Sequence, residues 1–166
     1  PLLTQTDAGT ANGNGPDQVA ATGAFESVFK VEFGADGATR LTLVDGAVVA
    51  DGRHYELSYT DGAATGLSDM ATGSDILLYN NNGVAEGRAA DGTVIFTLSI
   101  DEATGVVTLS QLGAIEHAAP DGVAGGLDET QLLAAGAISV VATAIDGDLD
   151  KADKAFDLGG RIAFGD

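Results

Sequence analysis

The stretch VIFTLSIDEATGVVTL, residues Val94–Leu109, decides the fold. Every second residue from Val94 to Ile100 is large and apolar, and side chains two positions apart lie on the same face of a β-strand. The loop residues that follow end in Gly105, which can adopt the positive φ that hairpin loops need. A second run rich in Val and Thr, residues 106–109, completes the pattern. The stretch therefore predicts two antiparallel strands joined by a short loop, with one face buried.

The same signals recur along the chain. Asp-Gly occurs seven times and Asn-Gly three times, and both pairs favour tight turns between strands. Phe25–Phe33 alternates apolar with polar residues, with Lys30 and Glu32 on the polar side. We expect further strands at Thr39–Leu43, His54–Thr60, Asp75–Tyr79, Val84–Arg88, Ala137–Ile145 and Ile162–Phe164. Many short strands separated by turns predict an all-β fold, namely an antiparallel β-sandwich that is immunoglobulin-like or related.

One segment carries helical signals instead. Asp128 can cap a helix, Gln131 stands at the capping-box position, and Gly136 is a stop signal. These signals predict one short helix at residues 129–135. The N-terminal segment is rich in Gly, Asn, Asp and Thr and shows little periodicity. We therefore expect residues 1–18 to form a linker or an irregular first strand, and residues 19–166 to form a single β-sandwich domain.

The chain is strongly acidic, with 25 Asp and Glu against 7 Lys and Arg among 166 residues and a formal net charge of −18. Clustered basic residues are what neutralise nucleic-acid phosphates, so we expect no nucleic-acid partner. No apolar run approaches the roughly 20 residues of a membrane span, so we expect no membrane insertion. A hydrophobic content of 45% indicates a folded chain, which we expect to be a monomer. The surplus of negative charge has to be offset, either by a high-salt environment or by bound cations.

The acidic segment that begins at Asp146 is the strongest candidate for such a cation site. Asp146, Asp148 and Asp150 alternate along it, and this spacing can wrap three carboxylates around one Ca²⁺. The segment is not an EF-hand loop, because Lys151 stands where that loop needs Gly and Asp157 where it needs a bidentate Glu. We therefore predict Ca²⁺ as the cofactor and these three Asp residues as its ligands. The alternative is a solvated acidic turn between two strands.

Two acidic residues in other turns are further candidate metal ligands. Asp69 and Asp101, the latter followed by Glu102, could complete cation sites, because the loops of a sandwich cluster at its two ends. The alternative is that each Asp serves only the backbone of its own turn.

The sequence lacks the common catalytic motifs. It has no cysteine nucleophile, no Gly-x-Ser-x-Gly elbow and no phosphate-binding glycine loop. The two histidines, His54 and His117, do not form a His-x-x-x-His zinc motif. A carboxylate pair for glycoside hydrolysis stays open, but the chain has no Trp and few aromatic residues to line a sugar cleft. We therefore expect a protein that is not an enzyme.

Five stretches, taken in order, resemble a known family. They are residues 33–38 (FGADGA), 66–73 (GLSDMATG), 94–109, 111–117 (QLGAIEH), and the pair 142–148 (ATAIDGD) and 157–164 (DLGGRIAF). In this order and spacing they resemble the large β-sandwich repeat domain of type I secretion target proteins, the giant RTX adhesins of Gram-negative bacteria. The chain departs from the family pattern at Leu149 and Lys151, which interrupt the acidic run, and at Ala118, which replaces the usual Pro.

The resemblance implies a secreted, extracellular, calcium-rich module on the surface of a Gram-negative bacterium. Its implied role is that of a structural spacer or scaffold that supports adhesion or biofilm attachment, with neighbouring domains of the same adhesin chain as partners. An alternative is a module that binds a surface glycan or peptide. A concave site with convergent polar groups and an exposed aromatic would mark that alternative, and the tyrosines available are Tyr55, Tyr59 and Tyr79. A hydrolase, the third alternative, would need a nucleophile and a carboxylate beside a histidine.

Overall fold

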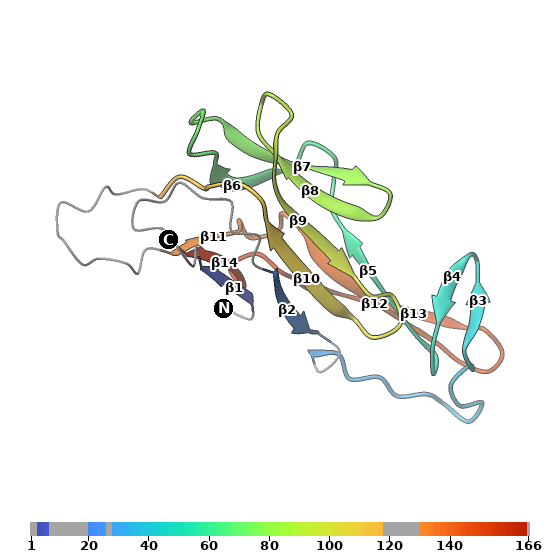
Figure 1. Cartoon of the computed structure of the whole chain (residues 1–166). Helices are drawn as coiled ribbons and strands as arrows, with labels where there is room; N and C mark the ends of the chain where they lie inside the picture. The colour runs from blue at the N-terminus through green and yellow to red at the C-terminus, as the bar shows by residue number, and fades with distance from the viewer. Residues whose placement is uncertain (1–2, 7–19, 26–27, 118–129, 166) are drawn as a thin grey trace.

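The computed structural model describes residues 3–6, 20–25, 28–117 and 130–165. These residues form strands joined by turns and contain no α-helix (Figure 1). The prediction of an all-β, antiparallel, sandwich-like fold is therefore confirmed. Among the described residues, no helix is long and apolar enough to cross a membrane.

The larger layer is an antiparallel sheet of six strands in the order β2-β10-β9-β8-β7-β6. The predicted hairpin forms its second and third strands, with Leu109 of β10 opposite Leu98 of β9. Both side chains are fully buried, because the alternating apolar residues face the core as their period requires. The strands are β2 (Ala20–Ala24), β6 (Ala64–Ser68), β7 (Asp75–Asn81), β8 (Val84–Arg88), β9 (Val94–Ile100) and β10 (Val106–Gln111).

The second layer is a sheet of three strands in the order β13-β12-β5. They are β5 (Arg53–Ser58), β12 (Ser139–Ile145) and β13 (Lys151–Asp157). Tyr55 and Val140 of this sheet are buried in the same apolar cluster as Leu98 and Leu109. The core therefore lies between the two sheets, as in a sandwich.

Two smaller sheets complete the part of the fold that the structure describes. In one, β14 (Ile162–Gly165) lies between β1 (Leu3–Thr6) and β11 (Thr130–Leu132). The pairing of β1 with β14 is parallel, unlike the antiparallel pairing elsewhere among the described strands. The other is the hairpin of β3 (Thr42–Val44) and β4 (Ala47–Val49), which lies at the opposite end of the molecule from β1 and β14 (Figure 1).

The predicted helix at residues 129–135 is wrong. Residues Thr130–Leu132 form the strand β11, which pairs with β14, and residues 133–135 are not helical either. Backbone groups here bond to distant segments, with Leu133 N donating to Ile162 O at 3.1 Å and Ala134 N to Thr65 O at 2.7 Å. Burial of Leu133 and sheet pairing outweigh a local capping signal of about two turns. The proposed cap, Asp128, lies outside the described residues.

The segment Phe25–Phe33 differs from the expected strand. Phe25 is buried, and residues 28–33 alternate between exposed and partly buried side chains but pair with no strand. Phe29 packs instead on Tyr55 and Phe156, with ring centroids 6.2 Å and 6.3 Å away. The period-two pattern therefore predicted correctly which side chains face the core, but the sheet pairing it implied does not form. Within the expected N-terminal linker, residues 3–6 form β1, and residues 7–18 lie outside the described part.

Candidate metal centre

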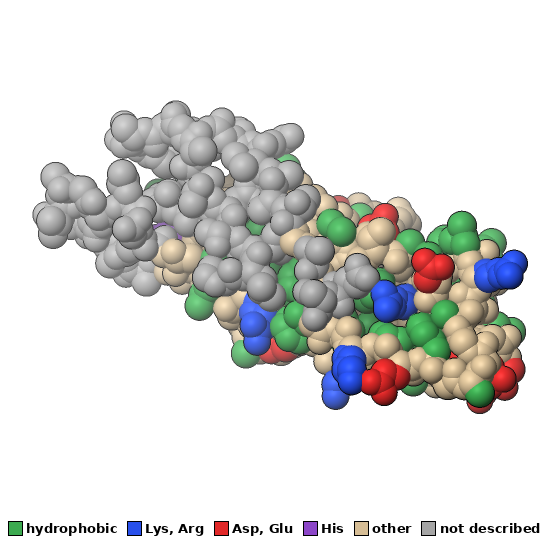
Figure 2. Space-filling model, turned by 90° about the horizontal axis from the view of Figure 1, so that it is seen from below, with side chains coloured by type: hydrophobic (Ala, Val, Ile, Leu, Met, Phe, Trp, Pro, Cys, Tyr) green, Lys and Arg blue, Asp and Glu red, His purple; other side chains and the backbone are tan. Residues whose placement is uncertain are grey.

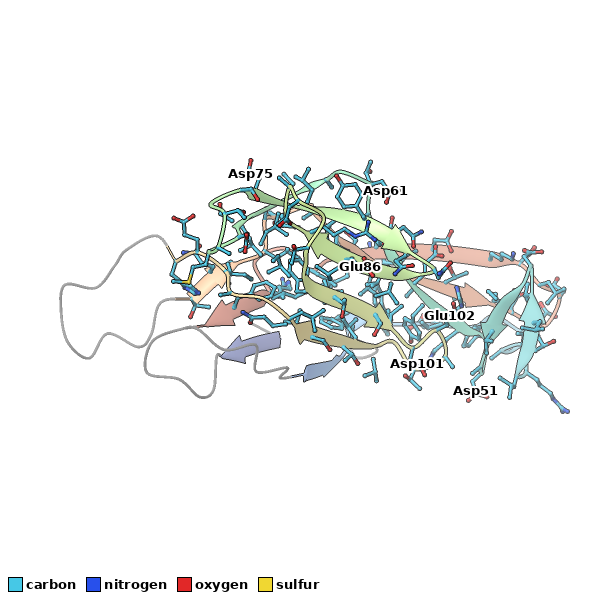
Figure 3. The ribbon with its side chains drawn as sticks, turned by 45° about the horizontal axis from the view of Figure 1, so that its top comes forward. Asp51, Asp61, Asp75, Glu86, Asp101 and Glu102 are labelled. Carbon is cyan, nitrogen blue, oxygen red and sulfur yellow. The ribbon has the colours of Figure 1, made fainter. Side chains whose placement is uncertain are left out.

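Acidic side chains are spread over the surface of the domain. In the described part of the face shown in Figure 2, basic side chains lie singly among acidic and hydrophobic ones and form no continuous patch. Figure 3 shows Asp51, Asp61, Asp75 and the neighbours Asp101 and Glu102 at separate turns and strand ends. Most of the negative charge is therefore dispersed, and a metal site needs a place where several oxygens converge.

The loop between β12 and β13 holds the three predicted ligands in a tight turn. Asp150 N donates to Asp146 Oδ1 at 2.9 Å, and Asp146 N donates to Asp150 O at 3.2 Å. Leu149 adopts a positive φ of 75°, and its N donates to Asp146 O at 3.2 Å. These bonds fix the direction of the Asp146 carboxylate.

A second segment, residues 34–39, packs against this loop. Gly147 N donates to Gly37 O at 3.0 Å, and Thr39 N donates to Ile145 O at 3.1 Å. The approach is close because Gly147 has no side chain: a Cβ built there would lie 2.5 Å from Asp36 O. The contact brings the Asp36 side chain to the β12–β13 loop.

Three carboxylates converge where the two segments meet. One oxygen each from Asp36, Asp146 and Asp148 lies within 4.8 Å of the other two, and we call these residues the acidic cluster. Oxygens that share one Ca²⁺ at 2.3–2.6 Å can be at most about 5 Å apart, so this spacing fits a single ion. Asp36 and Asp148 are exposed and Asp146 is partly buried, so further positions are open to water. Carboxylate ligands of this kind suit a hard cation such as Ca²⁺.

Two carboxyl groups of the acidic cluster shift each other's pKa values in opposite directions. A hydrogen bond from the Asp148 carboxyl group lowers the pKa of Asp146. The same bond raises the pKa of Asp148, and the charges of Asp146 and Asp150 raise it further. These opposed shifts arise because two neighbouring carboxylates repel each other and one proton between them relieves the repulsion. A cation bound in the cluster would take the place of that proton.

The structure brings together two of the three ligands predicted on this loop. The Asp150 carboxylate is not part of the three-residue group, although its backbone carbonyl and amide both bond to Asp146. Asp36 completes the group and was missed in the sequence, where Asp36-Gly37 reads as one turn among many. Asp36 lies beside the β12–β13 loop only in the folded structure, because the two are far apart in the chain.

The other two predicted metal ligands serve their own turns. Asp69 is buried and accepts hydrogen bonds from Thr72 N at 3.0 Å and Thr72 Oγ1 at 2.6 Å. Asp101 accepts from Thr104 N at 2.8 Å and from Thr104 Oγ1 at 2.9 Å, and these bonds hold its pKa below the usual value. Neither belongs to a group of three potential ligands among the described residues. Their geometry is that of Asp residues that stabilise turns.

The histidines are not members of the acidic cluster. His54 is buried on β5, with Nδ1 3.1 Å from Val48 O. His117 is partly buried beyond β10, and its Nδ1 has no hydrogen-bond partner among the described residues. Neither is part of a potential metal-binding group in the described chain.

The sequence profile of one protein family matches residues 3–159, almost the whole of this domain. Comparison with curated proteins and with solved structures gives no match. The matched range contains the two sheets, the β3–β4 hairpin and all three residues of the acidic cluster. The chain therefore belongs to the family described as Domain of unknown function (DUF5801).

Proposed function

We propose that this domain is a non-catalytic, calcium-binding scaffold in a secreted adhesin of a Gram-negative bacterium. The observation that carries the calcium assignment is the convergence of Asp36, Asp146 and Asp148 from two segments that are distant in the chain. The resemblance of the sequence to RTX adhesin repeat domains supports the extracellular setting and the role in surface adhesion. Neighbouring domains of the same chain are the proposed partners.

Calcium would act as a cross-link inside the domain. An ion held by Asp36 on one side and by Asp146 and Asp148 on the other joins the 34–39 segment to the β12–β13 loop, which backbone bonds already hold together. An ion that binds only the folded state stabilises it by about 2.7 kcal/mol when its concentration is a hundredfold above the Kd. Extracellular calcium modules have Kd values on the order of 0.1–1 mM.

The position of the acidic cluster limits what calcium can stiffen. The β12–β13 loop lies beside the β3–β4 hairpin, and Lys151 forms an ion pair with Asp45 of that hairpin. The first and last strands, β1 and β14, lie at the other end of the molecule (Figure 1). Calcium at the acidic cluster would therefore hold the hairpin end of the domain and not the end where β1 and β14 pair.

Thermal melting with excess Ca²⁺ or with a chelator tests the proposal. We expect the wild-type Tm to rise by about 5–11 °C with Ca²⁺, which is about 2.7 kcal/mol in a domain of this size. Asp36→Asn and Asp148→Asn should lose most of this gain. In chelator both should melt at or above the wild-type Tm, because each substitution removes one repelling charge from the acidic cluster.

Asp91→Asn is the matched control. Asp91 is exposed and its Oδ1 accepts a hydrogen bond from Thr93 N at 2.9 Å, outside the acidic cluster. This variant should keep the full calcium response. A wild-type Tm that is the same in calcium and chelator would remove the basis of the proposal.

A further inference from the structure

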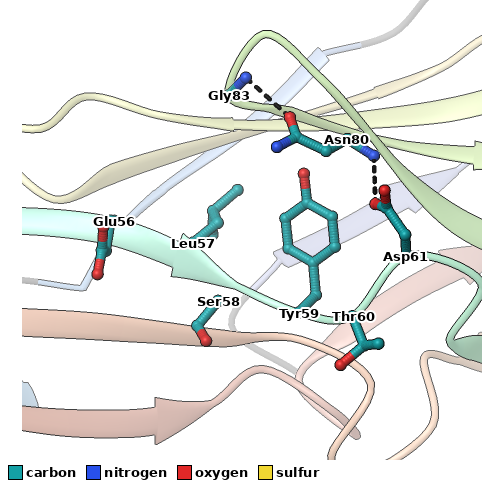
Figure 4. Close-up of a pocket in the computed structure, with 8 residues that line it drawn as sticks. All are labelled: Glu56, Leu57, Ser58, Tyr59, Thr60, Asp61, Asn80 and Gly83. Carbon is teal, nitrogen blue, oxygen red and sulfur yellow. Dashed lines mark hydrogen bonds between the residues drawn. The ribbon is translucent and has the colours of Figure 1, made fainter.

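A polar pocket lies at the rim of the sandwich, between the end of β5 and the β7–β8 turn (Figure 4). Its volume is about 530 Å³, within the range of sites that hold small ligands. It is separate from the acidic cluster and shares no residue with it. The pocket is lined by Glu56, Leu57, Ser58, Tyr59, Thr60, Asp61, Asn80 and Gly83.

Hydrogen bonds within and between the two sides hold the residues of this pocket in place. Asn80 N donates to Asp61 Oδ1 at 2.9 Å, and Gly83 N donates to Asn80 Oδ1 at 2.9 Å. Gly62 N also donates to Leu78 O at 2.7 Å, which holds the Asp61 turn against β7. The side chains of Asp61 and Asn80 are therefore positioned before any ligand arrives, which lowers the entropy cost of binding.

The same bonds leave one acceptor and one donor of the pocket without a hydrogen bond to the described residues. Asp61 Oδ2 and Asn80 Nδ2 make no hydrogen bond to the described residues, and both side chains are exposed. A hydroxyl group both donates and accepts, so a ligand with hydroxyls at several positions can bond to both groups. An ammonium group could use only the carboxylate and would leave the amide donor unpaired.

Tyr59 supplies an aromatic wall to the pocket. Its ring is partly buried against the core and lies between Leu57 and Asp61, with the hydroxyl end towards Asn80 (Figure 4). The other two tyrosines do not line this pocket. Tyr55 is buried, and the Arg88 guanidinium lies 5.4 Å from the centre of the Tyr79 ring. Aromatic rings beside polar groups suit the mixed apolar and hydroxyl surfaces of a sugar.

We infer that this pocket binds a neutral sugar unit, with Asp61 and Asn80 hydrogen-bonded to its hydroxyls and the Tyr59 ring against the sugar face. The carboxylates of Glu56 and Asp61 would repel phosphate or acidic sugars. Neither belongs to a group of three potential metal ligands in the described chain. The inference is independent of the calcium proposal.

Titration of the ¹⁵N-labelled domain, followed by amide chemical shifts, tests the assignment. The probes are the methyl glycosides of mannose, galactose and glucose, with Nα-acetyl-lysine methylamide as a cationic competitor for the same pocket. We expect at least one glycoside to shift the amides of Asp61, Asn80 and Gly83 with a Kd on the order of 1–10 mM. The shifts should be the same in chelator and in calcium, so that loss of the calcium response does not affect this result.

Asp61→Asn should weaken glycoside binding by roughly tenfold or more, because it replaces the carboxylate acceptor. Asp91→Asn is again the matched control, since it makes the same change in a turn outside the pocket, and it should bind as the wild type does. The inference is overturned if no glycoside moves these amides, if only the lysine derivative moves them, or if Asp61→Asn binds glycosides as well as the wild type.

Discussion

Gly147→Ala should separate the two halves of the acidic cluster without removing any carboxylate. The new Cβ would lie 2.5 Å from the backbone oxygen of Asp36, whereas Cβ atoms essentially never approach another heavy atom closer than 3.0 Å. The segment that carries Asp36 must therefore withdraw by at least about 0.5 Å. Ca²⁺ ligand distances span only about 0.3 Å, so this displacement is enough to take the Asp36 oxygen out of the coordination shell.

The loss of one carboxylate ligand is expected to raise the calcium Kd by roughly tenfold, or about 1.4 kcal/mol. At a calcium concentration a hundredfold above the wild-type Kd, stabilisation by the ion then falls from about 2.7 to about 1.4 kcal/mol. The calcium-dependent rise in Tm should fall from about 5–11 °C to about 3–6 °C. In chelator the variant should lose only about 0.5–1.5 kcal/mol, because the bond from Gly147 N to Gly37 O is weakened.

Differential scanning calorimetry in calcium and in chelator measures both quantities, and calorimetric titration gives the Kd directly. Gly34→Ala is the matched control: it lies in the same segment, and a Cβ there would meet nothing within 4 Å. Its calcium response should match the wild type. If Gly147→Ala also kept the full calcium response, the idea that Asp36 shares an ion with Asp146 and Asp148 would be refuted.

Three further predictions concern the larger sheet and the pocket. Hydrogen bonds from Asn81 and Arg88 lower the pKa of the buried Glu86, so its contribution to stability is complete above its ordinary pKa of 4.5 and is lost as the pH falls through the lowered value. Urea titrations should therefore show that Glu86→Gln loses less stability than the wild type on acidification. Gly87→Ala would place a Cβ 2.3 Å from the buried ring of Phe96 and should cost about 1–3 kcal/mol, seen as a lower Tm. Tyr59→Phe should raise the Tm of the unliganded domain, equivalent to about 1 kcal/mol, because the Tyr59 hydroxyl is buried with no hydrogen-bond partner among the described residues; a lower Tm would contradict this.

Sequence patterns predicted the elements whose local signal agrees with their tertiary environment. Val84–Arg88 was predicted with the observed bounds, and the Val94–Leu109 hairpin has the expected alternation. Lys151–Asp157 carries few large apolar residues and was not among the expected strand ranges, yet it pairs along its whole length with β12. An edge strand needs only one partner and can leave polar side chains on both faces, so hydrophobic periodicity does not reveal it.

The helical prediction at residues 129–135 failed for the opposite reason. Its capping signals were real but local, and they were weaker than the sheet pairing of Gln131 with Phe164.

Two of the three residues of the acidic cluster could be predicted from the sequence. Spacing identified Asp146 and Asp148 because they share a loop, but no sequence pattern reports that Asp36 packs against that loop.

The parallel pairing of β1 with β14 determines how this domain would respond to mechanical force. Leu3 pairs with Ile162 and Thr6 with Gly165, so the start of β1 lies beside the start of β14. A pull applied at the start of β1 and the end of β14 acts along the strands and loads the hydrogen bonds of this ladder in shear. Hydrogen bonds loaded in shear share the tension and break together. Hydrogen bonds of an antiparallel pair that is pulled apart from one end break one after another, at lower force. Under tension applied in this way, the hydrogen bonds between β1 and β14 would have to break before the force reached the rest of the domain.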